Sequence, residues 1–327
     1  MAIAVLGASS LLGKALIERL VRNRYPVEAI VAVDHFTEHD DDSDENDDRQ
    51  LDIADQSFEL SSPDAFDWGA VQVVIGCEPQ LVQDYADEAV SFGAVLLNAT
   101  NTEMLGAVST LSLADSEWVG AQGVYQVPNA TVLLLSHLLE RLDNEVGLET
   151  IHISVLNSVS DQGQSGISEL AGQTARLLNG LPVEPEVYAK QVAFNLLNNS
   201  SEGASTAEAV EQQLPLVFRD STPVIMAHSV TVPVFYGTMA LVSMQYTGVL
   251  SVAECADIWQ ALEGVELHLD QLVTLVTDLN QQPYLSVTEL RQSAQQPHQL
   301  KFCVQADTIY ACVVPYLEKL IQRISGN

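Results

Sequence analysis

The segment Gly7-Ala8-Ser9-Ser10-Leu11-Leu12-Gly13 constrains the fold of this chain more than any other. It follows the strand-like residues 2–6 and leads into the helix-like residues 12–21. Dinucleotide-binding folds place glycines at such a junction, because the missing side chains let a pyrophosphate approach the helix N-terminus. Gly7 and Gly13 stand at the tight-turn and helix-packing positions, whereas the middle position is Ser10. The segment predicts this fold, and it leaves open whether Ser10 crowds a phosphate or hydrogen-bonds to it.

Strand-like and helix-like runs alternate through the first part of the chain. Strands are predicted at residues 2–6, 28–33, 71–75 and 94–97, and helices at residues 12–21, 79–91 and 131–141. This alternation is typical of an α/β fold with a Rossmann-type, doubly wound parallel sheet.

The pattern changes after residue 148. A predicted strand at 151–156 and a helix at 166–178 precede three segments rich in β-branched residues, at 223–236, 248–252 and 264–276. These segments predict a second α/β (α+β) domain with a mixed or antiparallel sheet. A helix at 310–324 is expected to return to the first domain. We therefore expect one domain of residues 1–128 and 305–327, and a second of residues 129–304.

Asp34 ends the second predicted strand. An acid at this position commonly binds the ribose 2′-hydroxyl of NAD and rejects the 2′-phosphate of NADP. The acidic residues that follow add to that repulsion, so NAD is possible and NADP is disfavoured. It is equally possible that Asp34 only caps the strand and that no cofactor binds. The candidate cofactor-binding residues are Gly7, Ser9, Ser10, Leu11, Leu12, Gly13 and Asp34.

Charge and cysteine spacing exclude several classes of function. The chain has 44 acidic and 13 basic residues, a formal net charge of -31, and therefore repels nucleic acid and anionic membranes. Residues 38–48 contain a dense run of acidic residues, and this pattern predicts a solvated loop. They lack the glycine and the spacing of a calcium loop. The four cysteines lack C-x-x-C spacing, so neither a zinc site nor a disulfide framework is predicted.

The sequence also gives an expectation about localisation. It begins with a strand-like run and has no basic leader, so we expect no signal peptide. Residues 221–253 carry no charge, but prolines, glycines and the alternation of Val230, Val232 and Val234 predict strands rather than a membrane helix. We expect a soluble, cytoplasmic protein.

Five segments, in order, resemble the motifs of the aspartate-semialdehyde dehydrogenase family over essentially the whole chain. They are Gly7–Gly13, Val127-Pro128-Asn129-Ala130-Thr131-Val132, residues 156–163 with Glu169-Leu170, Ala193-Phe194-Asn195, and Thr231-Val232-Pro233-Val234-Phe235-Tyr236-Gly237-Thr238. The resemblance implies a nucleotide-binding domain, a second domain whose sheet forms a homodimer interface, and oxidation of an aldehyde in amino-acid metabolism through a cysteine nucleophile.

The resemblance also shows which reactive groups this chain lacks. The family's nucleophilic cysteine, supporting glutamine, substrate-binding arginine and basic histidine correspond to Ala130, Asn157, Thr231 and Thr238. A lysine and an arginine of its anion sites correspond to Glu211 and Met104. An alanine methyl group cannot attack a carbonyl carbon, and a threonine cannot act as a base near neutral pH. The pattern resembles the non-catalytic, usg-type members of the family.

Few other residues offer a replacement for the lost groups. Cys77 lies in a predicted strand-to-helix loop beside Glu78, which disfavours a thiolate, so we interpret it as a small apolar residue. His228 lies in an apolar strand, and we expect it to be packed in the core. Ser136 and His137 are adjacent on a helix and therefore cannot face each other.

Three hypotheses follow for the function. The favoured one is a catalytically silent homodimer that acts by binding another molecule or protein. The second is an NAD-dependent oxidoreductase that acts on another aldehyde or oxo substrate by altered chemistry. The third is a sensor that binds NAD without turnover. Affinity for the cofactor separates the first hypothesis from the other two, and turnover separates those two.

Overall fold

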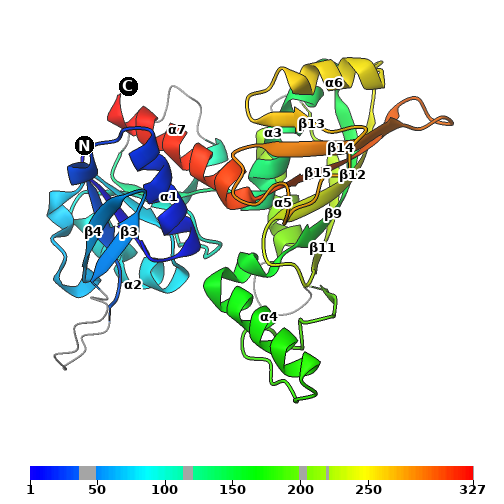
Figure 1. Cartoon of the computed structure of the whole chain (residues 1–327). Helices are drawn as coiled ribbons and strands as arrows, with labels where there is room; N and C mark the ends of the chain where they lie inside the picture. The colour runs from blue at the N-terminus through cyan, green and yellow to red at the C-terminus, as the bar shows by residue number, and fades with distance from the viewer. Residues whose placement is uncertain (37–48, 113–120, 199–204, 219–220, 327) are drawn as a thin grey trace. The chain divides into compact units, whose positions relative to one another are not determined.

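The structure is a computed structural model, and it describes residues 1–36, 49–112, 121–198, 205–218 and 221–326. The chain divides into two compact units (Figure 1). The first unit comprises Met1–Pro128 and Tyr316–Asn327, and the second comprises Asn129–Pro315. The chain returns to the first unit at Tyr316 rather than at residue 305, because the preceding strand and a π-helix belong to the second unit.

The first unit contains an eight-stranded sheet in the order β3-β4-β2-β1-β5-β6-β8-β7. All neighbouring strands are parallel except β3 and β4, which form a hairpin that the sequence patterns did not predict. The strands are β1 (Ile3–Leu6), β2 (Ile30–Val33), β3 (Gln50–Ile53), β4 (Gln56–Ser61), β5 (Val73–Gly76), β6 (Val95–Asn98), β7 (Val108–Ser109) and β8 (Gly123–Gln126). The predicted parallel, doubly wound sheet is confirmed.

Helices of the first unit begin where the sequence supplies a cap. Ser10 accepts a hydrogen bond from the amide of Gly13 at the start of α1 (Leu11–Arg22). Glu78 accepts one from Leu81 at the start of α2 (Pro79–Ser91), whose first residue is proline. Both arrangements satisfy amides that a helix N-terminus leaves without partners. Short 3-10 helices lie at Val27–Ala29, Pro63–Ala65, Trp68–Ala70 and Thr110–Ser112.

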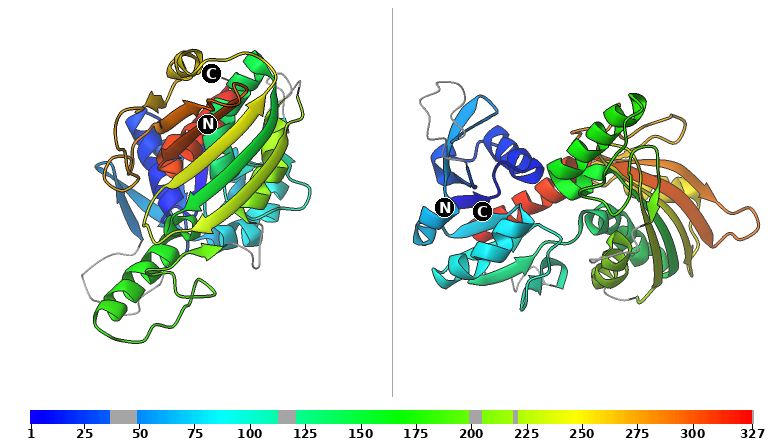
Figure 2. Two further views of the ribbon diagram at one scale, coloured as in Figure 1. Left: turned by 90° about the vertical axis from the view of Figure 1, so that its right-hand side faces the viewer. Right: turned by 90° about the horizontal axis from the view of Figure 1, so that it is seen from below.

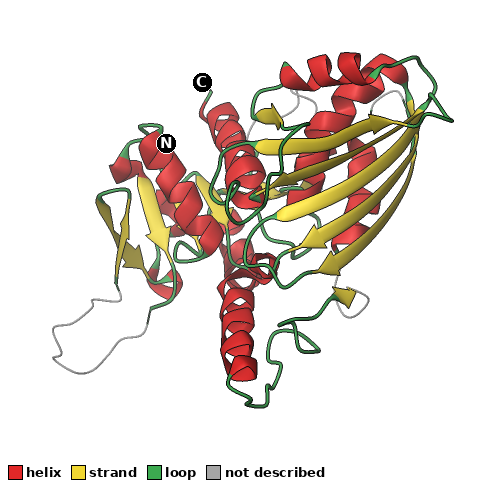
Figure 3. Ribbon diagram, turned by 45° about the vertical axis from the view of Figure 1, so that its right-hand side comes forward, coloured by secondary structure: helices red, strands yellow, loops and turns green. Residues whose placement is uncertain are grey.

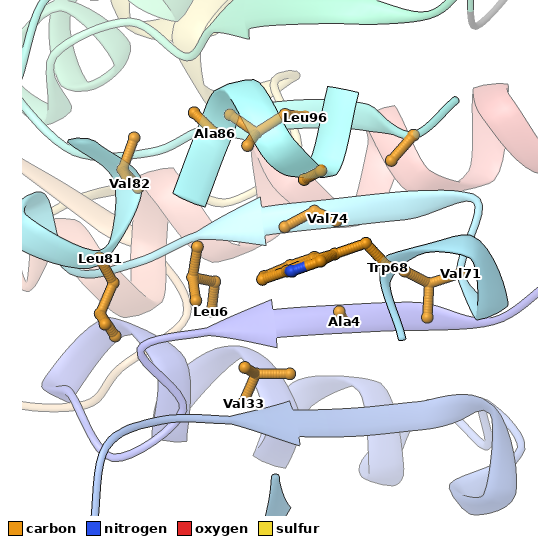
Figure 4. Packing of buried hydrophobic residues seen from close by; sticks show 12 residues of the cluster. Ala4, Leu6, Val33, Trp68, Val71, Val74, Leu81, Val82, Ala86 and Leu96 are labelled. Carbon is orange, nitrogen blue, oxygen red and sulfur yellow. The ribbon is translucent and has the colours of Figure 1, made fainter. Parts of the chain in front are cut away.

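The core of the first unit surrounds Trp68, which lies among side chains of β1, β5 and α2 (Figure 4). The indole ring is fully buried and packs edge-on against Phe66 and stacks on Tyr85. The C-terminal helix α7 (Val314–Ser325) returns to this unit as predicted. Its Glu318 accepts from Arg19 Nε at 2.9 Å, so the two ends of the chain are joined within one unit.

The second unit contains a seven-stranded mixed sheet in the order β10-β11-β9-β12-β15-β14-β13. Strands β11 and β9 are parallel, as are β13 and β14, and the other pairs are antiparallel. The strands are β9 (Leu148–Asn157), β10 (Leu197–Asn198), β11 (Val224–Thr231), β12 (Thr238–Tyr246), β13 (Val265–Leu267), β14 (Leu285–Gln292) and β15 (Gln299–Ala306). The predicted mixed sheet is confirmed.

Helices cover one face of this sheet, which we call the inner face (Figure 3). Trp259 of α6 packs edge-on against Phe302 of β15 and donates its indole N–H to the Leu138 carbonyl of α3. The helices of the unit are α3 (Ala130–Val146), α4 (Gly163–Leu178), α5 (Thr206–Gln213) and α6 (Val252–Gln260), with shorter ones at Val159–Gln162, Leu214–Val217 and Ile309–Val313. The opposite, outer face of β11, β9 and β12 carries exposed side chains. The left view of Figure 2 shows these strands side by side.

Some local predictions for the second unit were wrong. Residues 248–252 form no strand, and of residues 264–276 only Val265–Leu267 does. The glycine at 248 lies directly against the backbone of Val146, which explains a turn there. Helices α5 and α6 were not predicted, although each starts with the S-x-x-E pattern of a capping box, at Ser205 and Ser251. Among the described residues, no helix is both long and apolar enough to cross a membrane.

Candidate functional site

The predicted phosphate turn lies between β1 and α1, and its backbone is tightly held. Gly7 has φ +88°, a conformation that L side chains rarely adopt, and its amide donates to the Val33 carbonyl at 2.9 Å. A side chain at Gly13 would lie 2.3 Å from the Gly7 carbonyl oxygen, so helix and turn pack as closely as glycine allows. The amides of Leu11 and Leu12 start the helix and have no acceptor inside it. This geometry suits an anion.

A carboxylate of the chain itself lies at this turn. Asp34 accepts hydrogen bonds from the amide of Ser9 at 2.8 Å and from that of His35 at 2.9 Å. Ser10 is occupied as the helix cap. The seven predicted cofactor residues therefore form one local structure, in which Asp34 is fixed and negatively charged beside the turn. A second phosphate at the ribose would meet that charge directly.

The environment of Cys77 disfavours a nucleophilic thiolate. It is buried, and burial together with the nearby charge of Asp34 raises the pKa of its thiol far above the usual value. A neutral thiol is a poor nucleophile. Glu78 is used as the cap of α2 and packs beside Gly7. The interpretation of Cys77 as a small apolar residue agrees with this environment.

In the second unit, Ala130 is the first residue of α3. The preceding Asn129 caps the helix by accepting from the amide of Thr131 at 2.9 Å. The Asn129 amide donates to Gln213 Oε1 of the α5 segment at 2.8 Å, which fixes the helix start. The position that resembles the family's nucleophile is thus a well-ordered helix N-terminus. It presents a methyl group where the chemistry needs a thiolate.

Three further family positions form a single row across the sheet. Thr231 of β11 pairs with Asn157 of β9, and Asn157 pairs with Thr238 of β12. Residues directly opposite each other on neighbouring strands point to the same face, here the inner face. All three are buried, with exposed fractions of 5%, 1% and 7%. None of these side chains titrates near neutral pH, so the row supplies neither a base nor a cation.

Asn157 has a specific partner, which sequence reasoning missed. Its Nδ2 donates to Thr206 Oγ1 of α5 at 2.7 Å, and both side chains are buried. The S-x-x-E pattern that starts at Ser205 could have revealed this helix, but not its contact with Asn157. The amide that corresponds to the family's supporting glutamine therefore ties β9 to α5.

Glu211 and Met104, which the resemblance aligns with anion sites of the family, carry no positive charge. Glu211 Oε1 accepts from the Ala227 amide at 2.8 Å, so this carboxylate satisfies a backbone group of β11. Met104 packs against the apolar core of the first unit. Both side chains have local structural roles, and neither can attract a phosphate or a carboxylate.

The expectation for His228 was wrong. Its side chain is exposed on the outer face of β11, whereas its neighbour Ser229 points inward and is buried. Successive residues of a strand point to opposite faces, so an apolar neighbourhood in sequence does not decide which of the two is buried. In α3, Ser136 donates to the Leu133 carbonyl at 3.2 Å. In the portion of the chain that the structure covers, no three His, Cys, Asp or Glu side chains gather as metal ligands.

Fold and site together define the class of protein: a Rossmann-type unit followed by a mixed-sheet unit with a helix-covered row formed by Asn157, Thr231 and Thr238. A family model described as "Semialdehyde dehydrogenase, dimerisation domain" matches residues 139–310, and the chain belongs to this family. The resemblance inferred from the motifs is confirmed.

Individual relatives agree with this family. The chain is 23% identical over 322 residues to aspartate-semialdehyde dehydrogenase 2 of Vibrio cholerae, covering 94% of this chain and 92% of the relative. It is 24% identical to the USG-1 protein homolog of Pseudomonas aeruginosa, with the same coverage. The structure of aspartate semialdehyde dehydrogenase II from Vibrio cholerae, complexed with ASA, superposes with a TM-score of 0.87 at 21% identity, covering 100% of this chain and 98% of that one.

Proposed function

We propose that this chain is a catalytically inactive member of the aspartate-semialdehyde dehydrogenase family that acts as a homodimeric binding or interaction protein. The row of Asn157, Thr231 and Thr238 carries this proposal, because it contains no group that titrates near neutral pH. Ala130 adds the loss of the nucleophile. The first unit would be the nucleotide-binding domain and the second the dimerisation domain.

The combined changes leave little of the family's chemistry. A nucleophile and its base act as a unit, and removing either alone costs several orders of magnitude in rate. Here the positions of both are inert, and the position of the substrate-binding cation is neutral. Asn157 is already bonded to Thr206. A residual rate above that of the uncatalysed reaction would have to come from binding alone.

The test is a comparison of three proteins in phosphate-dependent oxidation of aspartate semialdehyde with NAD or NADP. We expect no turnover by the unmodified protein or by the single variant Ala130→Cys. The fourfold variant Ala130→Cys, Asn157→Gln, Thr231→Arg and Thr238→His restores the chemical groups and is the one expected to gain activity. An active family enzyme is assayed in parallel. Turnover by the unmodified protein, or by Ala130→Cys alone, would contradict the proposal.

The homodimer part of the proposal rests on what we call the bare face. It consists of ten residues on the outer side of the central strands: Val224, Met226, His228 and Val230 of β11, His152, Ser154 and Leu156 of β9, and Met239, Leu241 and Ser243 of β12. Val224, Met226 and Leu241 are 60%, 50% and 45% exposed. None of the ten is acidic, lysine or arginine, and the two histidines are neutral at high pH, although the whole chain has a net charge of -31.

A second copy is the occupant that fits this face. Two chains of charge -31 repel each other least where their surfaces lack carboxylates, and apolar exposed side chains gain from burial. The matched family model is also a dimerisation domain. Sedimentation equilibrium of the unmodified protein should give a dimer, and Leu241→Glu should give a folded monomer. A monomeric unmodified protein would refute this part.

Asp34 favours a second candidate function, an NAD-dependent oxidoreductase of altered chemistry. The carboxylate is fixed by Ser9 and His35 next to a turn of the right geometry, so NAD is compatible and NADP is disfavoured. Calorimetric titration with each cofactor tests it. Micromolar binding of NAD would favour an oxidoreductase or a sensor and justify a substrate screen. No binding at millimolar cofactor would leave the inactive homodimer.

A further inference from the structure

Two of the seven histidines lie on the bare face. His152 of β9 pairs with Met226 of β11 and with Ser243 of β12. His228 of β11 pairs with Ser154 of β9, one step further along the same face. Both side chains are exposed. They are diagonal neighbours on adjacent strands, and they are the members of the bare face that can gain a charge near neutral pH.

One carboxylate of these three strands lies at the edge of this face. On β9 the nearest charged residue is Glu149, at the start of the strand, where it accepts from Gln245 of β12 at 3.2 Å. Strand β11 adds no other titratable residue to this face, and β12 adds none. Beyond β12, the outer face of β15 carries Lys301, which would repel a protonated histidine. Protonation of His228 therefore places a positive charge among apolar and hydroxyl side chains, whereas His152 lies nearer to Glu149.

We propose that His152 and His228 make pairing of two copies dependent on pH, with the dimer favoured when both imidazoles are neutral and weakened by acid. This inference rests on the homodimer of the proposed function. The sign follows from linkage, since a buried imidazole without a carboxylate partner binds a proton less readily than an exposed one. The dimer therefore holds fewer protons than two separate chains, and lowering the pH favours the separate chains.

The size of the effect follows from the number of imidazoles. About one pH unit below the ordinary histidine pKa of about 6.5, keeping one imidazole neutral costs a factor of about 10. If one histidine per chain is covered in the dimer, the dissociation constant rises about 100-fold. If both are covered, four imidazoles in the dimer raise it about 10,000-fold.

The test is the dissociation constant of the dimer at about pH 8 and about pH 5.5 at fixed ionic strength, by sedimentation equilibrium. The dissociation constant of the unmodified protein should be at least about 100-fold higher at the lower pH. The double variant His152→Asn and His228→Asn, whose side chains cannot gain a charge, should lose most of this dependence. His298→Gln is the matched control, because His298 is also exposed but binds the Gly248 carbonyl outside the bare face. It should keep the full dependence.

The outcomes separate this inference from the proposed function. A protein that is monomeric at both pH values contradicts the homodimer itself. A dimer whose dissociation constant is the same at both pH values leaves the homodimer intact and overturns the inference. An equal pH dependence in the double variant overturns it as well, because the proton would then bind elsewhere. Circular dichroism at both pH values identifies unfolding as a separate cause.

Discussion

Gly13→Ala tests the packing of the phosphate turn. From the structure, we expect this substitution to destabilise the protein and a matched glycine-to-alanine substitution to stabilise it. A methyl group at Gly13 would lie 2.3 Å from the Gly7 carbonyl oxygen and within 2.9 Å of two Ala8 backbone atoms. Ordinary contact needs about 3.5 Å, so helix or turn must shift by about 1 Å. Overpacking of this kind costs about 1–3 kcal/mol. Because three backbone atoms are involved, we take the upper part of that range.

The substitution also has a favourable term. Replacing glycine by alanine inside a helix stabilises it by about 1 kcal/mol. The net expectation for Gly13→Ala is a loss of about 2 kcal/mol in the free energy of unfolding, or a fall of about 4–8 °C in Tm. The shift should also disturb the hydrogen bond from Ser9 to Asp34. Urea unfolding followed by circular dichroism measures the loss.

Gly172→Ala is the control. Gly172 lies in α4, and nothing comes within 4 Å of a side chain added there. The same chemical change should therefore stabilise the protein by up to about 1 kcal/mol. The two variants should differ by about 3 kcal/mol, with opposite signs relative to the unmodified protein. A Gly13→Ala variant as stable as Gly172→Ala would refute the inferred close packing.

Three further predictions concern buried polar groups. The four cysteines are buried, and burial raises the pKa of each thiol, for Cys255 and Cys312 to about 12. Ellman's reagent should therefore label the native protein at about pH 8 far more slowly than the unfolded protein. Asp143→Ala should cost about 1–3 kcal/mol in unfolding free energy, because it leaves the buried amide of Leu148 without its acceptor, whereas Asp143→Asn should cost less. Burial raises the pKa of Asp307. Its contribution to stability is therefore present below the ordinary Asp pKa of about 4 and is lost as the pH rises through the higher folded-state pKa. Asp307→Asn should flatten the pH dependence of the free energy of unfolding in urea above about pH 4.

The elements of the first unit were predictable because their signals are local. The limits of α2, Pro79–Ser91, coincide with the predicted ones, since proline at the first position and the apolar period are both in the sequence. The hairpin β3–β4 was missed. Its strands are short and mostly polar, and about every second side chain is apolar. This alternation is a weak sequence signal for a strand next to the acidic residues that precede it.

The second unit was harder to predict because its pairing is long-range. The long strand β12 runs through the uncharged segment at 221–253, where the sequence shows strands but not their ends. The direction of His228 depended on the register of β11 against β9, and a slip of one residue would reverse every side chain of the strand. Apolar neighbours in sequence cannot fix that register.

The sequence by itself determined which reactive groups are missing at the positions that resemble the family's catalytic residues, since no fold can give the Ala130 methyl group a lone pair or make a threonine basic. It also determined the glycine turn and its flanking strand and helix, which depend on neighbouring residues only. Tertiary structure decided which groups meet. Asn157, Thr231 and Thr238 are far apart in sequence and form one row only because β11, β9 and β12 pair in a particular register. That register is set by burying the inner face under helices, which is a property of the whole sheet.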